Sequence, residues 1–129
     1  MRNLFFILIL LAGCHSKDLS KEEILKKSFP SSKRANFLLK NLEKNKATAI
    51  VFLSPGCPLC QSYSPTLNAI SKKYVESQIS VMGVVSGTDF SLEQVKSYAD
   101  SFEVNFPVIL DKEKLLEKEF DATITPEVF

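Results

Sequence analysis

Tryptophan is absent from the 129-residue sequence, histidine occurs once, and there are only two arginines and three cysteines. The histidine, His15, lies near the N-terminus, and a zinc site needs about four ligands, so we expect no bound metal. Arg2 and Arg34 are too few to form the arginine cluster that grips a phosphate group. The formal net charge is +1, without a basic excess or an acidic tail, which argues against nucleic acid as a partner. The length and ordinary composition predict one small domain without a cofactor.

Residues 1–13 have the pattern of a secretory signal peptide. A short polar start precedes an unbroken apolar run, Leu4 to Leu11, that is too short to span a bilayer. The segment Leu11-Ala12-Gly13-Cys14 then resembles the bacterial lipobox, in which the cysteine is acylated and the preceding residues are removed. This resemblance implies a lipid anchor at Cys14 and a place in the bacterial cell envelope, periplasmic or on the outer face of the membrane. The alternative is an ordinary signal peptide followed by a chance cysteine.

The cysteine count supports a redox interpretation of the rest of the chain. If Cys14 carries lipid, two cysteines remain, Cys57 and Cys60, separated by two residues. Export also places them where disulfides persist. We expect residues 14–32 to be a tether with one short helix, since Ser20 and Glu23 have capping-box spacing. Residues 33–129 are then the folded domain.

Strand and helix patterns alternate along this domain. Short apolar runs predict buried strands at residues 47–54, 79–85 and 106–110. Apolar residues at helical spacing predict helices over about 33–44, 57–75, 91–102 and 114–120. This order predicts an α/β fold, with a parallel-type sheet and helices on its faces.

The Cys57-Pro58-Leu59-Cys60 segment follows the first predicted strand and opens a helix. Disulfide exchange needs one thiolate that attacks and a second thiol that resolves the mixed disulfide. At a helix N-terminus, Cys57 would have a lowered pKa, while Cys60 would lie one turn deeper. Pro58 suits the first helical turn. A structural disulfide, half of a zinc site or two core thiols are alternatives, but a two-residue gap at a helix start favours redox chemistry.

The order of motifs resembles the active-site turn of the thioredoxin superfamily, and more narrowly its redoxin branch, the alkyl hydroperoxide reductase/thiol-specific antioxidant (AhpC/TSA) type. Pro65 matches the proline inside the active-site helix, and Thr125-Pro126 matches the cis-proline that faces the cysteines. The resemblance implies a thioredoxin-like three-layer sandwich with a central mixed sheet. It also implies catalytic Cys57 and Cys60, a redox-active Cys57–Cys60 disulfide, and substrate binding at Pro58, Thr125 and Pro126. The partners would be protein thiols, protein disulfides or a reductant protein.

Three features depart from the thioredoxin pattern. Gly56 stands where thioredoxins have tryptophan, and the strand at residues 47–54 has no carboxylate to act as a buried proton acceptor. The sequence given ends at Phe129, whereas the family continues with a β-hairpin and a final helix. We therefore expect a sandwich that is incomplete at the C-terminus, with strands that show one flank to water.

Two other functions remain open. Peroxiredoxins place a hydroxyl residue three before the cysteine, as Ser54 does here, but they also use a proline and an arginine that this segment lacks. A redoxin-like binding module with an inactive cysteine pair is the second alternative. The sequence favours a thiol–disulfide oxidoreductase over both.

Overall fold

The computed structural model describes residues 19–129. The signal peptide and the lipidation of Cys14 lie outside the described residues. In chain order the elements are α1 (Lys21–Leu25), β1 (Ser28–Pro30), β2 (Asn36–Leu38), the 3₁₀ helix η1 (Leu39–Lys44), β3 (Ala47–Phe52), α2 (Pro58–Tyr74), the 3₁₀ helix η2 (Val75–Ser77), β4 (Ile79–Ser86), α3 (Leu92–Ser101), β5 (Val108–Asp111), α4 (Leu115–Phe120) and β6 (Glu127–Val128). No helix within this range is both long and apolar enough to cross a membrane.

The central sheet is mixed, with strand order β5-β4-β3-β6. The strand β4 pairs in parallel with both β3 and β5, while β6 runs antiparallel to β3. The main chain of Phe129 continues this pairing through two hydrogen bonds of 2.9 Å with Ile50. The three predicted strands and the helices that follow them are therefore confirmed, with shifts of a few residues at their ends.

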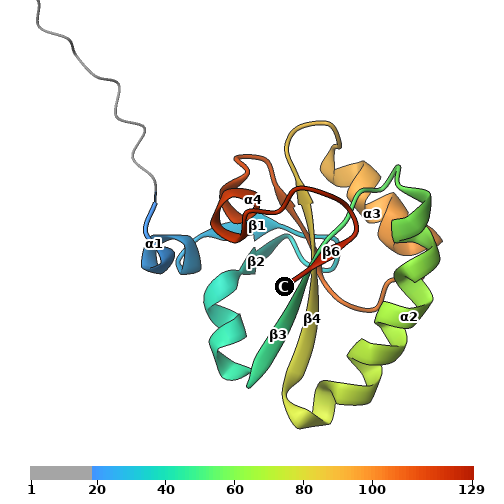
Figure 1. Cartoon of the computed structure of the whole chain (residues 1–129), viewed down its shortest axis with the longest axis horizontal. Coiled ribbons are helices and arrows are strands. Elements are labelled where there is room, and N and C mark those ends of the chain that lie inside the picture. The colour runs from blue at the N-terminus through green and yellow to red at the C-terminus, as the bar shows by residue number, and fades with distance from the viewer. Residues whose placement is uncertain (1–18) are drawn as a thin grey trace, which may run out of the picture.

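Helices α2 and α3 cover one face of the sheet (Figure 1). Successive residues of a strand point to opposite faces, so alternate residues of β3 and β4 belong to two separate cores. On this face Val51, Val81 and Val85 pack with Leu67 of α2 and Val95 of α3. This core lies directly behind the start of α2, where the two cysteines are.

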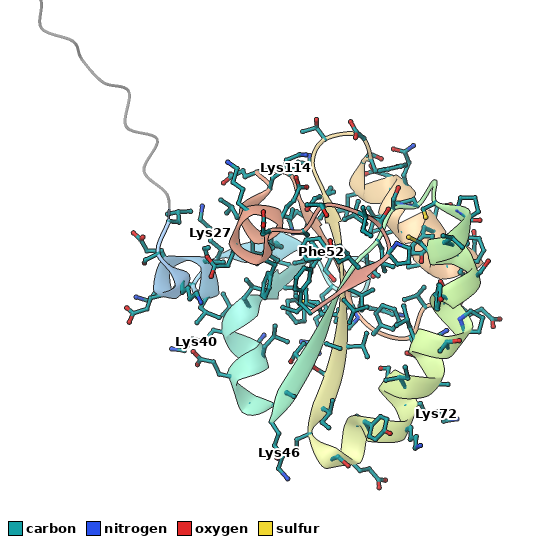
Figure 2. All side chains as sticks on the ribbon, viewed as in Figure 1. Lys27, Lys40, Lys46, Phe52, Lys72 and Lys114 are labelled. Carbon is teal, nitrogen blue, oxygen red and sulfur yellow. The ribbon has the colours of Figure 1, made fainter. Side chains whose placement is uncertain are left out.

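The other face of the sheet is covered by α1, η1 and α4 (Figure 1). Phe52 and Met82 point to this side and pack with Ile24, Leu39 and Leu116, and all five side chains are buried. In Figure 2, Phe52 lies in the interior. The expectation that these strands show one flank to water is therefore wrong, because the N-terminal segment and α4 fill that layer.

The predicted helix over residues 33–44 is only partly correct. Residues 39–44 form η1, but Asn36–Leu38 is the strand β2, paired antiparallel with β1. In this hairpin Phe37 lies opposite Phe29, which is buried in the core of the second face. Pairing with β1 and burial of aromatic surface outweigh the helical spacing of the leucines.

The fold begins before residue 33, where the sequence placed its boundary. The short helix predicted after Ser20 is present as α1, with Ser20 and Glu23 forming a capping box. Beyond it, the main-chain N–H of Ser32 donates to the carbonyl of Val108 at 2.9 Å, and Ser31 forms a bridge with Ile109. Residues 21–32 are thus part of the domain because they pair with β5 and supply buried apolar side chains.

Candidate active site

The turn between β3 and α2 places the two cysteines at the carboxyl end of the central strand. The carbonyl of Ser54 accepts from the N–H of Cys57 at 3.0 Å, and the Gln61 side chain donates to the carbonyl of Pro55 at 2.9 Å. Pro58 then occupies the first turn of α2, where no intrahelical N–H is needed. This local geometry makes Cys57 the N-cap residue of the helix.

The two sulfur atoms have different surroundings. Cys57 is half-buried, whereas Cys60 is 0% exposed and belongs to the core under α2 and α3. The main-chain N–H of Cys60 donates to Cys57 Sγ at 3.4 Å, and that of Ser54 donates to Cys60 Sγ at 3.4 Å. Both cysteines are free thiols in this structure. An external reactant can reach Cys57, while Cys60 is reached only from Cys57.

These surroundings move the two pKa values in opposite directions. The N–H of Cys60 stabilises the thiolate of Cys57 and lowers its pKa below the ordinary thiol value. Burial disfavours the charged form of Cys60 and raises its pKa to about 11. At neutral pH the attacking form, a thiolate, is therefore concentrated on Cys57.

The Thr125–Pro126 segment lies against the cysteine turn. The peptide bond between them is cis, and the thiol of Cys57 donates to the carbonyl of Thr125 at 3.6 Å. The Glu127 carboxylate accepts from the N–H groups of Thr123 at 2.8 Å and Ile124 at 3.3 Å, which holds the preceding loop. The structure thus brings Cys57, Cys60 and Thr125 together although 68 residues separate Cys57 from Thr125.

Exposed apolar side chains and a cavity border this turn. Leu59, between the cysteines, is 60% exposed, and Ile124, just before Thr125, is 67% exposed. A cavity of about 300 Å³ lies beside Ile124, between the ends of β3 and β4 and the loop at residues 122–125. Such exposed apolar surface beside the half-buried thiol of Cys57 is suited to contact with another molecule.

Sequence reasoning missed two residues near the site. Tyr98 of α3 donates to the carbonyl of Cys60 at 3.3 Å and lies 2.9 Å from the hydroxyl of Ser64. It stands three residues after Val95, so the helical periodicity that predicted α3 could have placed it on the buried face. Glu127 is the other residue, and its contact with the loop carries no sequence signal because an acidic residue after proline is ordinary.

The charged side chains that other kinds of catalysis would require lie away from the cysteine turn. Arg34 lines a pocket with Asn45 and Ser80, at the amino ends of β3 and β4, opposite to the end that carries Cys57. The carboxylate of Asp111 is fully buried, but its oxygens accept from the first amides of α4. Within residues 19–129 no group of three or more His, Cys, Asp or Glu side chains could hold a metal ion.

Comparisons with known proteins point to the same fold. The chain is 26% identical over 69 residues to the thioredoxin-like protein YneN of Bacillus subtilis, a match that covers 54% of this chain and 41% of that protein. A secreted disulfide oxidoreductase of Mycobacterium tuberculosis, homologous to E. coli DsbE, superposes with a TM-score of 0.65 at 19% identity, over 81% of this chain and 75% of that one. Peroxiredoxin Q of Xanthomonas campestris superposes with a TM-score of 0.67 at 17% identity, and the match covers 78% of this chain and 62% of that one.

A family model accounts for nearly all of the described residues. The model of the AhpC/TSA family matches residues 22–129, from α1 to the end of the chain given. The match begins where the structure places the start of the fold and includes both the cysteine turn and the cis-proline. This chain belongs to the AhpC/TSA family and has a thioredoxin-like fold.

Proposed function

We propose that the domain is a thiol–disulfide oxidoreductase that acts through Cys57 and Cys60. The observation that carries this proposal is the asymmetry of the pair. Cys57 is accessible and its thiolate is stabilised by the N–H of Cys60, whereas Cys60 is fully buried with a raised pKa. An attacking thiolate and a shielded resolving thiol are the two groups that disulfide exchange requires.

In the proposed reaction the Cys57 thiolate attacks one sulfur of a partner disulfide. A bond forms between Cys57 Sγ and that sulfur, and the second partner sulfur leaves as a thiolate that takes a proton from water. Cys60 then attacks Cys57 Sγ, and its proton passes to the departing partner sulfur. The partner disulfide is reduced by two electrons to two thiols, while Cys57 and Cys60 become a disulfide. The same steps in reverse oxidise a partner dithiol.

The partner is proposed to be a polypeptide that lies across the cis-proline loop. The backbone of Thr125 and Pro126 lies against Cys57, and Pro58 is exposed at the start of α2. The exposed side chains of Leu59 and Ile124 offer apolar contacts on either side of the reacting sulfur. We therefore assign Pro58, Thr125 and Pro126 to substrate binding, with the apolar residues favouring apolar segments of the partner.

The test is to trap the mixed disulfide. A Cys60→Ser variant should accumulate covalent complexes with partner proteins through Cys57, because the resolving thiol is absent. The matched Cys57→Ser variant retains the buried thiol and should trap little. An absence of complexes with Cys60→Ser, together with no reduction of insulin disulfides by the unaltered protein, would favour a non-catalytic binding module.

Peroxide reduction is the alternative enzymatic function in this family. A peroxidatic cysteine needs an arginine beside it, but Arg34 lies at the opposite end of the sheet from Cys57. After correction for the fraction of Cys57 that is ionised, we expect its thiolate to react with hydrogen peroxide no faster than the thiolate of free cysteine. A rate enhanced by several orders of magnitude would assign peroxidase chemistry to Cys57 instead.

We also propose that the domain works outside the cytoplasm on a lipid anchor at Cys14. The support is the sequence Leu11-Ala12-Gly13-Cys14 after an eight-residue apolar run, Leu4 to Leu11. Mass spectrometry of the protein isolated from membranes should find an acylated Cys14 as the N-terminus. A different N-terminus, with an unmodified Cys14, would refute the anchor without affecting the redox proposal.

A further inference from the structure

Two buried hydroxyl groups lie directly behind the resolving cysteine. Ser64 of α2 is 0% exposed and Tyr98 of α3 is 4% exposed. The Ser64 hydroxyl donates to the carbonyl of Cys60 at 3.1 Å, and that of Tyr98 donates to the same carbonyl at 3.3 Å. The two hydroxyl oxygens are 2.9 Å apart, so the Tyr98 proton is shared between the carbonyl of Cys60 and the Ser64 hydroxyl oxygen. Together they form a hydroxyl pair that joins α3 to the main chain of Cys60.

This pair stands in an otherwise apolar core. The surrounding side chains include Leu67, Val85 and Val95, which could equally pack against a phenylalanine at position 98. A buried tyrosine packs no better than a phenylalanine in the same place. Its hydroxyl costs free energy to bury unless it is hydrogen-bonded. The contact with Cys60 therefore indicates a role for the hydroxyl beyond filling space.

The contact is directed at the residue that controls both sulfur atoms. The N–H of Cys60 donates to Cys57 Sγ, and Cys60 Sγ accepts from Ser54. Holding the carbonyl of Cys60 restricts rotation of this residue, and with it the direction of the N–H that stabilises the Cys57 thiolate. Pro65 increases the need for such support, because it cannot donate the helical hydrogen bond to Gln61.

We propose that Tyr98 is a positioning residue for the dithiol, which acts with Ser64 by holding the main chain of Cys60 in the geometry of the reduced site. This inference rests on the proposed exchange at Cys57 and Cys60 and adds a residue from outside the cysteine turn. Burial raises the pKa of Tyr98, so its hydroxyl remains a hydrogen-bond donor when Cys57 is a thiolate. Because the pair supports the thiolate form, its removal should shift the equilibrium toward the disulfide.

The decisive variant is Tyr98→Phe in the full-length protein, since it removes one oxygen and keeps the ring. The equilibrium constant for reduction of the Cys57–Cys60 disulfide by glutathione should fall about fivefold, as expected for one lost hydrogen bond. That change corresponds to about 20 mV for a two-electron couple. The rate of alkylation of Cys57 at pH 7 should fall by a similar factor, because a smaller fraction of Cys57 is thiolate.

Two further variants separate positioning from general loss of stability. Tyr74→Phe removes a hydroxyl from a more exposed position on α2 and should change neither the equilibrium constant nor the alkylation rate. Ser64→Ala should shift both in the same direction as Tyr98→Phe. The double variant should shift them less than the product of the two single effects, because both hydroxyls act on one carbonyl.

The outcomes distinguish this inference from the function on which it rests. If Tyr98→Phe and Ser64→Ala lower the melting temperature but leave the equilibrium constant and alkylation rate unchanged, the pair is only structural and the inference is wrong. Should Tyr98→Phe fail to fold, Ser64→Ala alone decides in the same way. If the unaltered protein forms no Cys57–Cys60 disulfide when it is equilibrated with glutathione disulfide, which is reduced to two glutathione thiols in the exchange, the proposed function fails before any variant is compared.

Discussion

The loop that carries the cis-proline should loosen when the Glu127 carboxylate is removed. This carboxylate accepts from the N–H of Thr123 at 2.8 Å and from that of Ile124 at 3.3 Å. One hydrogen bond to a charged group contributes about 1.5–3 kcal/mol, and because both amides are exposed and the second distance is long, we expect the two together to contribute near the lower end of this range. We therefore expect Glu127→Ala to cost about 2 kcal/mol of local stability in this loop.

The assay is hydrogen exchange at individual amides. A loss of about 2 kcal/mol corresponds to roughly 30-fold faster exchange at Thr123 and Ile124, since 1.4 kcal/mol is a factor of ten. Glu127→Gln retains a neutral acceptor, and charge-assisted bonds are about twice as strong as neutral ones, so its effect should be about fivefold. Trapping of partners by Cys60→Ser should also weaken, because Thr125 follows the loosened segment.

The control is Glu22→Gln, a matched change at an exposed position on α1. It should leave exchange at Thr123 and Ile124 unchanged. If Glu127→Ala leaves the exchange of both amides at the rate of the unaltered protein, the carboxylate does not hold the loop and the reasoning fails. A uniform increase across the whole domain would also contradict it, because the effect is expected to be local.

Four further predictions follow from named contacts. Alkylation followed by mass spectrometry should give an apparent pKa for Cys57 below the ordinary thiol value, while Cys60 reacts only near its pKa of about 11. The pKa of Cys60 is higher in the folded state than in the unfolded state, so the folded reduced protein binds this proton more tightly. The contribution of this bound proton to the free energy of unfolding should be complete below the ordinary thiol pKa and should be lost as the pH rises toward 11. Asp111→Ala should lower the free energy of unfolding in urea by about 2–4 kcal/mol, because it removes the acceptor for the buried amides of α4. Gly83→Ala should cost about 1–3 kcal/mol in thermal unfolding, since its Cβ would lie 2.9 Å from Leu53 Cδ1.

Each of these has a result that contradicts it. For the pH dependence, it is a free energy of unfolding of the reduced protein that does not fall between pH 9 and pH 11. Equal alkylation rates for both cysteines at pH 7 would refute their different surroundings. A loss below about 0.5 kcal/mol for Asp111→Ala, the range of ordinary surface changes, would mean that water replaces its hydrogen bonds. An unchanged melting temperature for Gly83→Ala would show that Leu53 and the neighbouring Val108 can move aside.

Local patterns in the sequence determined most of the elements that position the site. The apolar runs at residues 47–54 and 79–85 correspond to strands because the residues toward their carboxyl ends are buried on both faces of a sheet. The Cys-x-x-Cys spacing with Pro58 predicted the start of α2, since capping preferences depend on neighbouring residues. The same reasoning failed at residues 33–38, where no helix forms and Asn36–Leu38 is the strand β2.

The resemblance to the thioredoxin superfamily predicted that Thr125-Pro126 faces the cysteines, but only the tertiary structure decided how this segment and Tyr98 contact them. The contact of Cys57 with Thr125, and that of Cys60 with Tyr98, join residues far apart in the chain. The failure at residues 33–38 has the same cause, because β2 exists through its pairing with β1 and not through its own propensity. The sequence by itself identified the cysteine pair that we propose as the redox centre and the helix that carries it. The partners that set the exposure, the pKa and the orientation of the pair come from chain packing, because those interactions depend on distance in space and leave no periodic pattern in the sequence.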